Sequence, residues 1–106
     1  MSRVLFNRAI LTGISITLGE NNHNFSDEPA YYNNDESLCK RLQRTIGFGT
    51  RYWANEGTTT CDLCEDAAKR LLKAKNIMPT DIDAIISVTQ TPDYYMPGNA
   101  HILHER

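Results

Sequence analysis

The chain has 106 residues, a formal net charge of −2 and a hydrophobic fraction of 41%. This length suits one small domain, and the charge argues against a basic surface for nucleic acid. No apolar run approaches the ~20 residues of a membrane span, and Asn7 and Arg8 interrupt the apolar start, which argues against a signal peptide. We therefore expect a cytoplasmic protein with three reduced cysteines and without nucleic-acid or membrane partners.

The first half of the chain is expected to hold a strand, a loop and a helix. Residues 4–19 are rich in Ile, Leu, Val and Thr and predict a strand, whereas the Asn-rich and acidic residues 20–38 predict a surface loop. Residues 35–47 carry leucines at helical spacing, with Asp35 as the expected N-cap and a glycine as the stop. Residues 48–57 predict an aromatic turn or a short strand.

The clearest helix is expected in residues 58–76. Thr59 or Thr60 can cap it, acidic residues fill its first turns, basic residues crowd its end, and Asn76 suits a left-handed stop. One apolar stripe follows the helical period, at Leu63, Ala67, Leu71 and Ala74.

The second half is expected to add a buried strand. Residues 84–90 form a nearly continuous apolar run, which is typical of a parallel strand covered on both faces. Strand, helix and strand in this order indicate a β-α-β unit and an α/β protein. Asn99 is a plausible cap for a further helix. The other predicted strands are too few to cover residues 84–90, so we expect the chain to be the front portion of a larger α/β protein.

Three stretches carry a family resemblance. "AILTGISITLG", "EGTTTCDLCEDAAKRLLKAKNI" and "DIDAIISVTQTPDYYMPGNAHILHER" together cover most of residues 9–106. In order and spacing they resemble the N-terminal part of the β-ketoacyl-acyl-carrier-protein synthase III family. The last stretch is the most specific of the three.

The resemblance implies a fold, a reaction and partners. It implies an α/β chain with part of a thiolase-like fold, the N-terminal strand, helix and strand of a layered αβαβα architecture. Residues 1–106 would then be the N-terminal portion of a synthase domain, with the remainder outside the chain. The family joins acyl groups by Claisen-type condensation, as homodimers, with coenzyme A or acyl carrier protein as the thioester carrier and no covalently bound cofactor. Its catalytic Cys, His and Asn lie beyond the matched region, so the chain alone is expected to be inactive and to contain no catalytic residue.

The resemblance also implies substrate-binding positions near the end of the chain. Met96 matches the family position that reaches the acyl-binding channel of the dimer partner, although a methionine can also fill a core gap. Gln90 and Thr91 fall at the end of the predicted strand, facing the same region.

Coenzyme A binding is expected in the first helix, with a departure from the family. When the sequence is anchored on Gly47, Arg41 and Thr45 take the places of a Trp and an Arg that hold the adenine. An offset of one residue matches Arg44 and Thr45 instead. An arginine can stack on a base or pair with phosphate, but a solvated helix charge is the simpler interpretation. The departure favours an acyl group delivered on the carrier protein, or a divergent substrate.

Other interpretations stay open. Cys61 and Cys64 could bind zinc together with His101 and His104, or form a redox pair, but small residues on a packed helix explain the cysteines more simply. The alternative to an enzyme portion is a non-catalytic α/β module that associates with itself or with a partner through its apolar surfaces.

Overall fold

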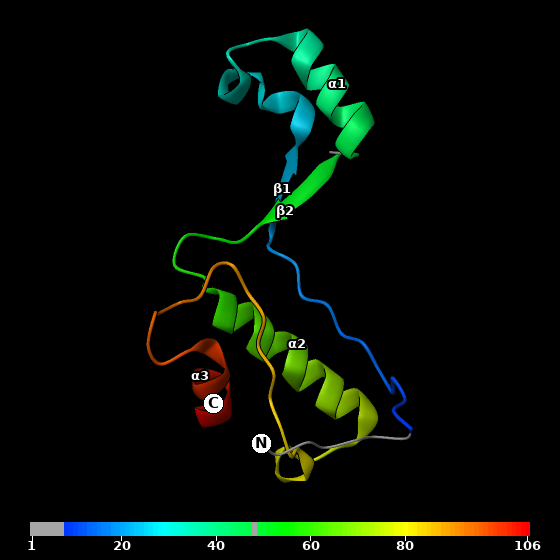
Figure 1. Cartoon of the computed structure of the whole chain (residues 1–106), viewed down its shortest axis with the longest axis vertical. Coiled ribbons are helices and arrows are strands. Elements are labelled where there is room, and N and C mark those ends of the chain that lie inside the picture. The colour runs from blue at the N-terminus through cyan, green and yellow to red at the C-terminus, as the bar shows by residue number, and fades with distance from the viewer. Residues whose placement is uncertain (1–7, 48) are drawn as a thin grey trace, which may run out of the picture.

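The computed structural model describes residues 8–47 and 49–106 of the chain. Within these residues an arm, residues 20–58, projects from a body that contains the remaining segments (Figure 1). The arm contains β1 (Asn21–Asn24), α1 (Glu36–Ile46) and β2 (Thr50–Trp53), with 3₁₀ turns at Phe25–Asp27 and Pro29–Tyr32. The body contains α2 (Thr60–Lys75), a 3₁₀ turn at Pro79–Asp81 and α3 (Asn99–Glu105).

Helix α2 confirms the strongest prediction from the sequence. Thr59 caps it, and the Thr59 and Asp62 side chains form a capping box in which each accepts a hydrogen bond from the backbone of the other. Asn76 ends the helix in the left-handed conformation at φ 54°. Both ends are therefore set by local side-chain chemistry, which is why the bounds could be predicted.

Two extended segments, residues 8–19 and 82–92, run along α2 in the direction opposite to it (Figure 1). Gly13 lies beside Leu71, and the Thr17 hydroxyl donates to the Asp66 carboxylate at 2.7 Å. At the other end of the helix, the Thr60 hydroxyl donates to the Thr91 carbonyl at 2.8 Å. Both segments therefore share one direction, as the predicted β-α-β order requires.

The predicted strands at residues 4–19 and 84–90 are nevertheless wrong as hydrogen-bonded strands. Where the structure describes them, from residue 8 onward, both segments are extended but belong to no backbone ladder, while residues 4–7 lie outside the described part. The sheet that the described residues form is the antiparallel pair β1 and β2, so the expected parallel sheet is also absent from this part. A strand requires a neighbour to bond with, and periodicity cannot supply one.

The predicted loop at residues 20–38 is wrong as well. Residues Asn21 to Asn24 pair with Trp53 to Thr50, and the 3₁₀ turns follow. The reason is Phe25, which is only 1% exposed and meets the Tyr32 ring edge-on at 5.3 Å. Its N–H donates to the Gly49 carbonyl at 3.1 Å, so one buried aromatic residue organises a stretch that reads as polar.

The remaining arm elements agree with the sequence. Asp35 caps α1 by accepting from the N–H groups of Ser37 and Leu38, and Gly47 ends the helix at φ 76°. Strand β2 confirms the short aromatic strand expected in residues 48–57, of which residue 48 lies outside the described part. The His23 ring stacks on Trp53 at 4.0 Å, and Arg51 pairs with the buried Glu28 carboxylate.

The chain buries little of its apolar surface. It exposes 9513 Å², whereas a compact monomer of this mass exposes about 6,000 Å². Its radius of gyration is 18.6 Å, against about 13 Å for a compact domain of this length. Among the described apolar side chains, Phe25 and Cys61 are the ones that are buried. No helix in the described part is long and apolar enough to cross a membrane.

Two glycines on the first extended segment give a test of this packing. A Cβ at Gly19 would lie 2.1 Å from the Trp53 carbonyl carbon, which is backbone and cannot move aside. A Cβ at Gly13 would meet the side-chain tips of Lys75 at 2.7 Å and Leu71 at 2.9 Å, which can rotate away. We predict that Gly19→Ala destabilises the arm by about 1–3 kcal/mol through overpacking, and that Gly13→Ala costs distinctly less.

Urea titration followed by fluorescence of Trp53, the one tryptophan of the chain, measures both variants under the same conditions. Equal unfolding midpoints for the two variants would contradict the close approach of Gly19 to β2.

Candidate functional site

The predicted carrier-binding residues share one face of α1. Arg41, Arg44 and Thr45, spaced at i, i+3 and i+4, line a hollow of about 570 Å³ together with Ser37 and Lys40. We call these five residues the basic α1 face. The structure thus brings together all three residues that the resemblance selected.

The charges on this face are largely available to a ligand. In the described part of the chain, neither Arg41 nor Arg44 forms an ion pair with a carboxylate, whereas Lys40 pairs with Glu36 at 3.3 Å. The Thr45 hydroxyl is occupied locally, since it donates to the Arg41 carbonyl at 2.6 Å. The pKa of Asp35 is lowered first by the Leu38 N–H and, least among its causes, by Arg41, which lies near that carboxyl but not in direct contact with it. Two guanidinium groups one turn apart can hold phosphate oxygens through paired N–H donors.

The predicted acyl-binding residues lie in the body, away from the basic α1 face. Thr91 sits at the start of α2, where its carbonyl and hydroxyl meet the Thr60 hydroxyl at 2.8 and 3.1 Å. Gln90 precedes it and is exposed. Met96 is 88% exposed in the loop between residues 92 and 98, beside Tyr95 at 99%. The structure therefore does not gather these three residues into one pocket.

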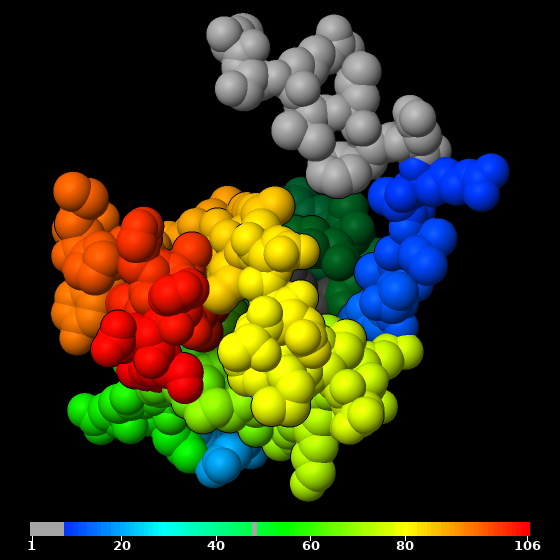
Figure 2. Space-filling model, turned by 90° about the horizontal axis from the view of Figure 1, so that it is seen from below, coloured from blue at the N-terminus to red at the C-terminus, as the bar shows by residue number. Residues whose placement is uncertain are grey.

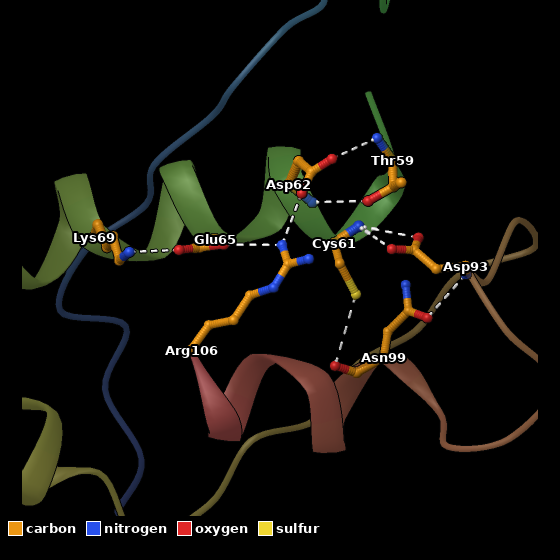
Figure 3. Close-up of polar contacts among 8 residues, drawn as sticks. All are labelled: Thr59, Cys61, Asp62, Glu65, Lys69, Asp93, Asn99 and Arg106. Atoms are coloured by element: carbon orange, nitrogen blue, oxygen red, sulfur yellow. Dashed lines mark hydrogen bonds and ion pairs between the residues drawn. The ribbon is translucent and has the colours of Figure 1, made fainter. Parts of the chain in front are cut away.

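The start of that loop is fixed by residues that the sequence reasoning missed. The Asp93 carboxylate accepts the Cys61 N–H at 3.1 and 3.4 Å, and the Asp93 N–H donates to the Asn99 side-chain oxygen at 3.1 Å (Figure 3). Cys61 is 0% and Asn99 3% exposed, and the Cys61 thiol faces the Asn99 carbonyl at 3.9 Å. The prediction of Asn99 as the N-cap of α3 is wrong, because Gly98 occupies that position.

A bridging arginine completes this group. The Arg106 guanidinium donates to Asp62 at 2.7 Å and to Glu65 at 2.9 Å, and Glu65 also pairs with Lys69 (Figure 3). Helix α3 has only seven residues, too few to be stable alone, so its position depends on ties at both of its ends. We call the bonded group at the start of α2, which includes these ties, the α2 cap cluster: Thr59, Cys61, Asp62, Glu65, Asp93, Asn99 and Arg106.

The cap cluster shifts the pKa of its ionisable groups. The pKa of Asp62 falls to about 2, first because it accepts the Thr59 N–H and then because of Arg106. The Thr59 hydroxyl and then the Cys61 N–H lower the pKa of Asp93. Burial raises the pKa of the Cys61 thiol, with Asp93 adding to the shift. A buried thiol with a raised pKa is a poor nucleophile, so Cys61 is suited to packing and not to covalent catalysis.

An apolar groove of about 870 Å³ lies between α2, α3 and residues 79–85. Leu71 and Leu72 of α2 face Ile82 and Ile85 across it, with Leu103 on α3. Figure 2 shows this side of the molecule, where α3 in red and the segment near residue 80 in yellow border the hollow. Among residues 8–47 and 49–106, no group of three or more His, Cys, Asp or Glu is placed to hold a metal ion.

The chain is similar to several proteins that carry closely related names. No protein-family model matches the chain. A Campylobacter jejuni protein named 3-oxoacyl-[acyl-carrier-protein] synthase 3 is 39% identical over 101 residues, which is 94% of this chain and 29% of that protein. Beta-ketoacyl-[acyl-carrier-protein] synthase III 3 of Streptomyces coelicolor is 48% identical over 59 residues, covering 56% of this chain and 18% of its own.

A solved structure agrees with the sequence relatives. The crystal structure of a 3-oxoacyl-(acyl-carrier protein) synthase from Burkholderia xenovorans LB400 superposes with a TM-score of 0.73 at 28% identity, covering 87% of this chain and 27% of that one. The chain thus spans less than a third of the length of each of these three proteins.

The cap cluster is expected to make the folded chain less stable in acid. Asp62 has a folded-state pKa below its unfolded value of 3.8, so its contribution is complete above that value and is lost as pH falls toward about 2. We predict that the melting temperature falls over this range, and that Asp62→Asn is less stable at neutral pH with a weaker dependence on acid. Thermal unfolding monitored by circular dichroism at several pH values measures both effects.

The matched control is Asp81→Asn, at a carboxylate that, among the described residues, accepts from the Met78 N–H of its own short turn. An Asp62→Asn variant as acid-sensitive as the parent chain would contradict the role given to the capping box and Arg106.

Proposed function

Because the chain is related to β-ketoacyl-acyl-carrier-protein synthase III and shares part of its thiolase-like fold, we propose that it supplies the N-terminal part of a 3-oxoacyl-ACP synthase III-like acyltransferase. The complete protein would condense an acyl thioester with an extender on acyl carrier protein, in fatty acid or related lipid biosynthesis. The observation that carries the proposal is that sequence and structure point to the same kind of protein. One such synthase is 39% identical over 101 residues, and the solved structure of another superposes with a TM-score of 0.73.

The proposed contribution of this chain is architecture and binding, without the reacting groups. Condensation needs a thiolate and donors that stabilise an oxyanion. The buried position and raised pKa of Cys61 argue against it as that thiolate, and Cys39 and Cys64 do not match the nucleophile of the family. We therefore expect no condensation by the 106-residue chain alone.

The basic α1 face is the proposed site for the thioester carrier. Coenzyme A and the prosthetic arm of acyl carrier protein both present phosphate groups, and arginines without a direct carboxylate contact are well suited to bind them. Arg41 and Arg44 supply these groups, and the hollow of about 570 Å³ gives them a concave setting. Because both carriers present phosphate, we propose the basic α1 face as a site for either of them.

The exposed tip around Met96 is the proposed contact with the acyl-binding channel of a partner subunit in a homodimer. A methionine that is 88% exposed is free to enter an apolar channel, and a thioether adapts its shape to an acyl chain. The odd number of cysteines in the sequence, three, favours reduced thiols and the cytoplasm as the proposed location.

Carrier binding gives the direct test of this function. We predict that coenzyme A binds the chain and that the double variant Arg41→Ala/Arg44→Ala weakens binding by about tenfold or more, because each lost guanidinium removes charged hydrogen bonds. Isothermal titration calorimetry at two salt concentrations measures the affinity and its electrostatic share.

The matched control is Lys73→Ala/Lys75→Ala, which removes the same charge from the far end of α2. Coenzyme A affinity that is unchanged in the arginine variant, or equally weakened in the lysine variant, would contradict a carrier site on α1. The same titration with acyl carrier protein tests the second carrier.

A further inference from the structure

The side chains around the α1 hollow offer positive charge and hydroxyl groups. Lys40, Arg41 and Arg44 bring the cations, and Ser37 and Thr45 bring the hydroxyls. Among the described residues, no aromatic ring and no carboxylate lines this hollow. A guanidinium matches phosphate oxygens in geometry and in charge, whereas a nucleobase is held mainly by stacking on aromatic rings and by contacts to its edge. The lining therefore suits a phosphate better than a base.

The hydrogens of both hydroxyl groups are already bonded within the helix and its cap. The Ser37 hydroxyl donates to the Asp35 carboxylate at 2.9 Å, and the Thr45 hydroxyl donates to the Arg41 carbonyl at 2.6 Å. Because a hydroxyl carries a single hydrogen, neither group donates to a ligand in this arrangement. The side-chain donors that remain in the hollow are cationic, so the hollow recognises negative charge.

The aromatic rings of the described arm lie elsewhere. Phe25 is only 1% exposed, and Trp53 stacks on the His23 ring at 4.0 Å. Tyr31 and Tyr52 are exposed, but neither borders the hollow. This part of the arm therefore supplies no stacking platform for a base beside the two arginines.

We infer that the basic α1 face recognises its carrier through phosphate alone and does not select the nucleobase. Its ligands are phosphate and diphosphate esters, whatever group the ester carries. This selectivity rests on the carrier site proposed for α1 and adds what that site reads. Helix α1 lies at the outer end of the arm, where a large carrier protein can approach it (Figure 1). A phosphate-linked arm on such a protein is then held as well as coenzyme A, because the adenine adds nothing to binding at this face.

Ligands that share a diphosphate and differ in the base test this selectivity. ADP, CDP and inorganic pyrophosphate are titrated into the 106-residue chain, and the shifts of the α1 amide signals in NMR spectra give each dissociation constant. A purine stacks more strongly than a pyrimidine, so any stacking separates ADP from CDP. We predict dissociation constants for ADP and CDP within a factor of about two, pyrophosphate binding at least as tight, and no binding of adenosine.

Three variants separate charge from stacking. Arg41→Lys keeps the charge without the planar fork and should weaken ADP and CDP equally, by about two- to fivefold. Arg41→Trp places a ring on the same face and should make ADP bind about fivefold or more tighter than CDP. Phe48, which follows α1 in the sequence, lies outside the described residues, and Phe48→Leu should leave the ratio of ADP to CDP affinity unchanged. Circular dichroism checks the helix content of each variant.

The outcomes distinguish this selectivity from the carrier site itself. ADP binding more than about fivefold tighter than CDP in the parent chain, or ADP binding without pyrophosphate binding, overturns recognition by phosphate alone and leaves a carrier site on α1 standing. A ratio that changes in Phe48→Leu overturns it in the same way. Failure of every phosphate ligand to bind the folded chain overturns the carrier site, and the selectivity with it.

Discussion

The fold of this chain depends on the hydrogen bonds at the N-terminus of α2. A free helix start presents unsatisfied N–H groups, and here Thr59, Asp62 and Asp93 accept three of the hydrogen bonds at that end. Asp93 lies 32 residues from Cys61, so this acceptor is not local. By bonding there, it fixes the return of the chain beside α2 and the point from which α3 begins. The cap cluster therefore fixes α2, the returning chain beside it and α3 relative to one another.

The same arrangement leaves most apolar surface bare. Residues 8–19 and 82–92 lie on α2, but their outward side chains, such as Ile86 at 88% and Val88 at 92% exposed, have no layer over them. Burying one such side chain contributes roughly 1.5–3 kcal/mol, so covering these faces would add considerably to the free energy of unfolding. A thiolase-like domain of full length can provide the missing cover. The surface that needs a partner is the one that faces away from α2.

The sequence could predict what local chemistry decides and could not predict what distant partners decide. Helices α1 and α2 were predicted because Asp35, Thr59 and Asn76 mark their ends within a few residues. Residues 84–90 are extended but belong to no sheet among the described residues, since the apolar pattern shows a need for partners without showing where they lie. Strand β1 and the two 3₁₀ turns were missed because a single buried residue, Phe25, organises a polar stretch, and one aromatic residue creates no hydrophobic period along the sequence.

The candidate site shows the same division. Arg41, Arg44 and Thr45 could be grouped in advance because they lie within two turns of one helix. Asp93 and Asn99 could not, because their bonds to the start of α2 join segments more than thirty residues apart. The one available signal was the acidic residue directly after Thr-Pro at a predicted strand end, since a carboxylate there can reach a helix N-terminus.

The central claim is that this chain orders residues 82–92 along α2 without covering them, and amide hydrogen exchange tests it most directly. In dilute solution, where the chain is a single copy, the account predicts slow exchange in α2 and fast exchange throughout residues 84–90, because their N–H groups have no backbone acceptor in the described structure. Exchange in residues 84–90 as slow as in α2 would contradict the claim, since it would show that one copy already supplies the missing neighbours.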